Sequence, residues 1–164
     1  MLNRSILTAL VLCVLALGSS RIAAAQDSYG SPAKASPDQP SLYERLGGLM
    51  GISAAVSDLI DLLVMDDAIH MNKAVAAAHE RVPAAYLKYQ VTSMVCQATG
   101  GPCEYHGRTM KEAHAHLNIT EKEWERAIVL FNQVMAKHTV PEAESAELLG
   151  LLNSVKPDIV VPEQ

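Results

Sequence analysis

The residues best suited to do chemistry lie in one short segment between Met110 and Leu117. His114 follows Met110 by four residues and precedes Leu117 by three, so a helix would place these three side chains on one face. An imidazole flanked by apolar side chains can present a neutral ring nitrogen to haem iron. Its second nitrogen then needs an acceptor, and a backbone carbonyl of the preceding turn is the natural candidate. A lone histidine on an apolar face is often purely structural, so the spacing alone leaves both interpretations open.

The flanking residues indicate how this segment is positioned. Gly100-Gly101-Pro102 predicts a turn after one helix, and Thr120 predicts the cap of the next helix. His116 is the alternative ligand, but it points about 200° away from His114 on a helix of 3.6 residues per turn.

Several tracts together resemble the group 1 truncated haemoglobins over about residues 41–160. They are Ser41-Leu42-Tyr43-Glu44-Arg45-Leu46-Gly47-Gly48, Gly100-Gly101-Pro102, Tyr105, Gly107, Met110, Ala113-His114 and Leu117-Asn118-Ile119-Thr120. The resemblance implies an all-α truncated globin, in which two antiparallel helix pairs form a two-over-two sandwich around haem. It implies non-covalent haem b, with His114 as the proximal iron ligand, and a diatomic gas (O₂, CO or NO) as the small-molecule ligand.

The same resemblance implies which other residues surround the cofactor. It suggests a distal wall of Ile60, Leu87 and Val91, with Val95 one turn further along, and an aromatic contact from Trp124. Met110 and Leu117 are the expected apolar contacts beside the ligand. Arg108 is either a partner of a haem propionate or a solvated residue, and Tyr105 either holds the turn or reaches a propionate.

The distal wall departs from the family pattern in one important respect. Group 1 members usually carry Phe-Tyr where this chain has Leu59-Ile60, and that tyrosine hydrogen-bonds bound oxygen. Isoleucine has no donor. A hydrogen bond in a low-dielectric site is worth about 1–2 kcal/mol, so its loss would raise oxygen release on the order of tenfold. We therefore expect CO or NO to be favoured over O₂, relative to a member of the family that carries the tyrosine.

The N-terminal residues predict export. Residues 1–25 have a positive start, an apolar run and a small-residue cleavage site, as in a signal peptide, and the run is short for a transmembrane helix. Residues 26–40 are expected to be a disordered linker before the globin domain at 41–160. Removing Arg4 and Arg21 leaves 11 basic and 18 acidic residues, a formal charge of −7. This charge argues against nucleic acid as a partner, and we expect a periplasmic protein without stable membrane insertion.

Helical periodicity predicts helices over about 42–47, 49–65, 83–98 and 121–138. A last helix is expected to open at Pro141 and to stop before Lys156-Pro157. The stretch 66–82 is hard to interpret. The family expects an aromatic wedge there. Either Met71 or Val75 fills that space, or the pocket is looser. His70 and His79 are interpreted as solvated surface residues, with a distal iron ligand as the alternative.

Cys96 and Cys103 admit either a disulfide or a free, buried Cys96. No Cys-x-x-Cys-His motif supports covalent haem attachment.

Three functions compete: a gas-binding haem globin, a haem-dependent redox or NO-detoxifying enzyme served by an unknown reductase, and a globin scaffold that has lost haem and serves as an interaction module. We favour gas binding over enzymatic activity, because the sequence shows no evident distal acid–base residue.

Overall fold

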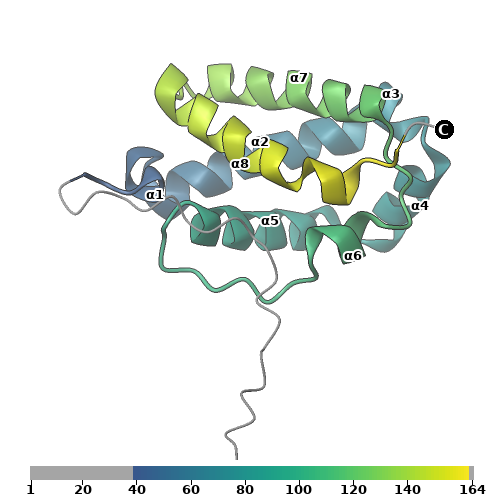
Figure 1. The fold of residues 1–164 in the computed structure, drawn as a ribbon, viewed down its shortest axis with the longest axis horizontal. Coiled ribbons are helices and arrows are strands. Elements are labelled where there is room, and N and C mark those ends of the chain that lie inside the picture. Colours follow the sequence, from purple (N-terminus) through teal and green to yellow (C-terminus); the bar gives the residue numbers. More distant parts are fainter. Residues whose placement is uncertain (1–38, 163–164) are drawn as a thin grey trace, which may run out of the picture.

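The computed structural model describes residues 39–162, and the regular elements of this part of the chain are all α-helices (Figure 1). The helices are α1 (Leu42–Arg45), α2 (Gly48–Met65), α3 (Asp67–His70), α4 (Lys73–Arg81), α5 (Ala84–Ala98), α6 (Met110–His114), α7 (Glu121–Lys137) and α8 (Glu142–Ile159). The predicted signal peptide and nearly all of the predicted linker lie outside the described residues.

Capping boxes set the start of three of these helices. Ser41 and Thr120 form the capping boxes that the sequence predicts, with Glu44 and Glu123 respectively. Thr109 forms a third box with Glu112, which starts α6. Each box satisfies backbone N–H groups that the first turn of a helix would otherwise leave unpaired.

The core consists of two clusters that meet on α2. Buried Ile52, Val56 and Ile60 on one side of α2 contact side chains of α5, and α2 and α5 form the most extensive helix pair. Phe131, Val134 and Met135 of α7 form the second cluster with Ala55 and Leu59 of α2 and three leucines of α8, Leu148, Leu149 and Leu152. The pairs α2–α5 and α7–α8 thus form the two layers of the sandwich, with α2 in contact with both (Figure 1).

By length and composition alone, α2 could cross a membrane. In the fold, however, it packs against both α5 and α7 and supplies three buried core residues. Its apolar character is therefore explained by its central position.

The stretch that was hard to interpret forms α3 and α4, joined at Asn72. The Asn72 side chain accepts bonds from the N–H groups of Ala74 and Val75, and its Nδ2 donates to the Leu117 carbonyl at 2.9 Å. Val75 is buried at 5% exposure, whereas Met71 is 82% exposed. Of the two residues considered for the space of the missing aromatic wedge, Val75 is the buried one.

The predicted end of the last helix was wrong. α8 continues through Pro157 to Ile159. A proline inside a helix removes one backbone hydrogen bond, but here the next turn is retained. It is closed by the bond from the Val160 N–H to the Lys156 carbonyl, and the Val161 N–H donates to the Ile119 carbonyl just after α6.

Candidate functional site

His114 lies at the C-terminal end of α6, and its ring orientation is fixed. Nδ1 lies 2.9 Å from the carbonyl oxygen of Met110, one turn earlier. A carbonyl can only accept, so Nδ1 carries the proton and Nε2 keeps its lone pair. The backbone acceptor expected for this histidine is therefore present, and Nε2 is the nitrogen available to a metal.

The surroundings of His114 favour the neutral ring. Burial lowers the pKa of the imidazole below its ordinary value of 6.5, and the nearby His116 and Arg108 lower it further, while the Met110 carbonyl acts in the opposite direction. His116 is exposed, whereas His114 is partly buried. Of the two histidines, His114 has both the fixed tautomer and the desolvated ring that ligation requires.

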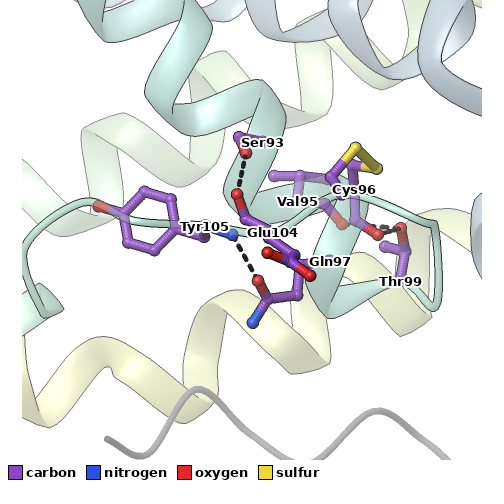
Figure 2. Close-up of a disulfide and its surroundings, with 8 residues drawn as sticks. Ser93, Val95, Cys96, Gln97, Thr99, Glu104 and Tyr105 are labelled. Atoms are coloured by element: carbon purple, nitrogen blue, oxygen red, sulfur yellow. Dashed lines mark hydrogen bonds between the residues drawn. A yellow bond between two sulfur atoms is a disulfide. The ribbon is translucent and has the colours of Figure 1, made fainter.

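A disulfide fixes the connection that delivers α6 to this position. Cys96, which is fully buried near the end of α5, is bonded to Cys103 in the loop (Figure 2). Gly101 makes the return possible, because a Cβ at this residue would lie 2.5–2.8 Å from Tyr43 and Cys96. The alternative of a free, buried Cys96 is therefore wrong, since the Gly-Gly turn brings Cys103 back onto α5.

Hydrogen bonds hold the rest of this loop. The Ser93 hydroxyl donates to the Glu104 carbonyl at 3.2 Å, and the Tyr105 N–H donates to Gln97 Oε1 at 2.6 Å (Figure 2). The Tyr105 hydroxyl donates to the Arg108 carbonyl at 2.8 Å. Of the two roles considered for Tyr105, this bond corresponds to holding the turn.

Gly107 is required beneath the Tyr105 ring. A Cβ at residue 107 would lie 2.1 Å from the tyrosine oxygen. The loop from Cys103 to Thr109 is thus held by one covalent bond, several side-chain hydrogen bonds and the close approach of the Tyr105 ring to Gly107.

The predicted distal residues come together in space. Leu87, Val91 and Val95 of α5 all pack against the cluster that contains buried Ile60. The neighbouring Tyr86 does not turn inward: its ring is 54% exposed and its hydroxyl accepts a bond from the Gln90 side chain at 2.8 Å. The face of α5 toward α2 is accordingly apolar.

An apolar cavity of about 250 Å³ lies between the two helix layers. Of the predicted site residues, Val91, Val95 and Met110 line it, whereas His114, Ile60 and Leu87 are not part of its wall. Met110 therefore connects the cavity to the helix that carries His114. The remaining wall comes from α2, α7 and α8, including Ala55, Leu59, Phe131, Met135, Leu148, Leu151 and Leu152.

His138 is a cavity residue that the sequence did not reveal. Its Nε2 lies 2.6 Å from Asp58 Oδ2, and Lys137 Nζ lies 2.8 Å from the same oxygen. Among the described residues, His138 is the only one with an ionisable side chain that lines the cavity. In the sequence, the only sign of this contact was that Asp58 lies off the apolar stripe of α2. That position does not identify His138, 80 residues away, as its partner.

Three other predicted residues lie on α7, just after α6 and just before α6. Trp124 of α7 is buried, with Lys156 Nζ 5.9 Å from its ring centroid. Leu117 is partly buried, and its carbonyl accepts the bond from Asn72. Arg108 is exposed in the loop that precedes α6.

The comparison with protein families agrees with this geometry. The family model of the bacterial-like globins matches residues 41–160, which includes every helix described above. The chain belongs to the bacterial-like globin family.

Within that family, the similar proteins are truncated haemoglobins. A group 1 truncated haemoglobin of Chlamydomonas moewusii is 25% identical over 148 residues, covering 87% of this chain and 81% of that protein. One from Synechocystis is 37% identical over 82 residues, covering 47% of this chain and 57% of its own. This globin is thus a truncated globin, as the sequence predicted, and haem is the cofactor that the family implies.

Solved structures confirm the fold. The truncated haemoglobin of Tetrahymena pyriformis in its Fe(III) form has a TM-score of 0.65 at 22% identity, covering 75% of this chain and all of that one. A 2/2 haemoglobin of Synechococcus in the cyanomet state, with covalently attached haem, has a TM-score of 0.64 at 21% identity, covering 74% and 98%. The predicted all-α, two-over-two architecture is confirmed.

Proposed function

We propose that this globin binds haem b non-covalently through Nε2 of His114 and reversibly binds a diatomic gas. The observation that carries this proposal is the bond from His114 Nδ1 to the Met110 carbonyl at 2.9 Å. It leaves Nε2 unprotonated, in a partly buried environment that keeps the ring neutral near pH 7.

The apolar interior suits a flat hydrophobic cofactor. Met110, Val91 and Val95 line the cavity between the layers, and Met110 is on the same helical face as His114. Haem supplies an iron that accepts one axial nitrogen from the protein and one diatomic ligand. The protein's part is to present His114, to exclude water with apolar side chains, and to hold α6 through the loop from Cys103 to Thr109.

The distal side chains support a preference among gases. Ile60, Leu87 and Val91 carry no hydrogen-bond donor, and Tyr86 faces outward. O₂ gains from a donor more than CO or NO does. We therefore propose that CO and NO are favoured over O₂, relative to a variant with tyrosine at position 60.

Non-covalent attachment is proposed although one solved relative carries covalently attached haem. Both cysteines of the described chain are joined to each other, so neither offers a thiol to the haem. The chain also lacks a Cys-x-x-Cys-His motif.

Export to the periplasm is part of the same proposal, with residues 1–25 as the signal peptide and 26–40 as a linker. The Cys96–Cys103 disulfide supports it, because disulfides persist in oxidising compartments and are rare in the cytosol. An unidentified reductase would keep the iron ferrous there.

The test is a gas titration of the reduced, haem-loaded chain followed by absorption. We expect saturable binding of CO at one gas per haem, fully reversed when CO is removed. Catalytic consumption of NO with a reductase, faster than simple association and release explain, would instead support the enzymatic alternative.

A further inference from the structure

The histidines of α3 and α4 form a partly buried pair that the haem site does not use. The ring centroids of His70 and His79 are 5.3 Å apart, and the rings are tilted by 30°. Nε2 of His70 and Nδ1 of His79 are both buried, and neither has a hydrogen-bond partner. Each ring thus has one nitrogen without solvent contact, although both residues are partly exposed.

Two adjacent orphan nitrogens need a physical explanation. Leaving a buried polar atom unpaired is costly, so such atoms in folded proteins commonly mark a bound water, a bound ion or a functional site. The Asp66 carboxylate, four residues before His70, is bonded instead to Arg126 at 2.6 Å and caps α3.

We propose that His70 Nε2 and His79 Nδ1 together bind one divalent transition-metal ion of the imidazole-preferring class, such as Zn²⁺. A tetrahedral ion about 2.0–2.1 Å from each nitrogen places the two ring centroids roughly 5 Å apart, which agrees with the observed separation. Neutral imidazole is the ligand that zinc, copper and nickel accept readily.

The surroundings of His79 favour its neutral ring. Burial and the neighbouring His70 lower the pKa of His79, so its lone pair is free near pH 7. Among the described residues, no group of three or more His, Cys, Asp or Glu side chains could hold a metal. The site therefore has two protein ligands, and water completes it, which makes it an exchangeable site rather than a closed structural one.

A bound ion would connect α3 to α4 across the Asn72 junction. Asn72 already bonds to the Leu117 carbonyl at the end of α6. The metal would thus brace the segment that contacts the His114 helix, in a region where the family pattern expects an aromatic wedge.

The experiment is calorimetric titration of the haem-loaded chain with Zn²⁺ at pH 7, together with thermal unfolding. We expect one Zn²⁺ per chain and a rise in Tm, both lost in His70→Gln and in His79→Gln. The matched control is His106→Gln, because the His106 side chain is 81% exposed and outside the pair; it should bind Zn²⁺ as the wild type does. Binding that survives both pair variants, or no binding by the folded wild type, would overturn the proposal.

Two further measurements locate the bound Zn²⁺ and separate its binding from that of haem. In wild-type protein, ¹⁵N NMR should show Zn²⁺ shifting the ring nitrogens of His70 and His79, which needs no variant; shifts confined to His106 or His116 would contradict the site. The haem-free His114→Ala chain should still bind one Zn²⁺, so the result does not depend on haem. If the reduced wild type is low-spin before CO and either pair variant makes it high-spin, these histidines bind haem iron and the proposal is wrong.

Discussion

Nδ1 of His114 donates to the carbonyl oxygen of Met110, one turn earlier on the same helix, at 2.9 Å. This bond belongs to α6, a helix of only five residues that begins at the Thr109 capping box. Because so short a helix has little stability of its own, the orientation of the ring depends on the loop before it and on contacts with its neighbours.

Breaking the disulfide should loosen this loop. We expect Cys103→Ser to lower the free energy of unfolding by about 2 kcal/mol, because the unfolded chain gains conformational freedom. Chemical denaturation with and without a reductant measures it. Reductant should destabilise the wild type and leave Cys103→Ser unchanged; equal sensitivity of the two proteins would contradict the role of this bond.

Gly107→Ala should disturb the same loop by a different route. Its Cβ would meet the Tyr105 ring at 2.1–2.6 Å and displace the hydroxyl from the Arg108 carbonyl. We expect a loss of roughly 1–2 kcal/mol in stability, with faster haem loss. Urea denaturation and haem transfer to an acceptor protein measure the two effects.

Gly150→Ala is the matched control for that change. Gly150 lies inside α8, and nothing within 4 Å would meet its Cβ. Alanine there should raise stability by about 0.5–1 kcal/mol, because it is the better helix former. If both substitutions destabilise equally, the close approach at Gly107 does not explain its effect.

The haem-free protein should lose stability in mild acid through His114. Its folded pKa lies below the ordinary value of 6.5, so only the unfolded chain takes up the proton as pH first falls past 6.5. This loss grows until the pH falls below the folded pKa, and it is absent well above 6.5. Thermal unfolding between pH 7.5 and 5 should show a steeper fall for wild type than for His114→Gln. The His106→Gln variant, whose side chain is 81% exposed and does not act on His114, should follow the wild type. A wild-type slope matching His114→Gln would refute this assignment.

The distal wall predicts a gain of oxygen retention in Ile60→Tyr. Ile60 is buried in the cluster that contains Leu87 and Val91, and a phenol there would supply the missing donor. We expect O₂ release to slow on the order of tenfold, with CO release much less affected. Ile60→Phe controls for ring volume without the hydroxyl. Laser photolysis and stopped-flow mixing give both rates, and an O₂ off-rate unchanged by the hydroxyl would sink the proposal.

Local rules predicted much of this fold. The boxes at Ser41 and Thr120 and the apolar stripe of α2 follow from short-range chemistry, and the structure reproduces them. The prediction that the last helix stops before Pro157 was wrong. The local cost of the proline is offset by backbone hydrogen bonds to the Lys156 and Ile119 carbonyls, and the second of these depends on tertiary structure.

The site was less accessible to sequence reasoning. The pairing of Cys96 with Cys103, the contact of His138 with Asp58 and the burial of His70 against His79 each depend on how separate segments are placed. Hydrophobic periodicity predicts which face of a helix is buried, but it does not predict which other segment packs against that face. Family resemblance supplied His114 and the distal positions, whereas the structure supplied the bond that orients His114.

The central claim is that His114 Nε2 binds haem iron. The most direct measurement is the absorption spectrum of residues 26–164 with haem added, in the ferric, dithionite-reduced and CO-bound forms, for wild type, His114→Ala and the exposed control His116→Ala. If Nε2 of His114 binds the iron, wild type and His116→Ala show a strong Soret band that shifts with CO, and this band is lost or abnormal in His114→Ala. Failure of the folded wild-type chain to take up stoichiometric haem, or an unchanged spectrum in His114→Ala, would contradict it.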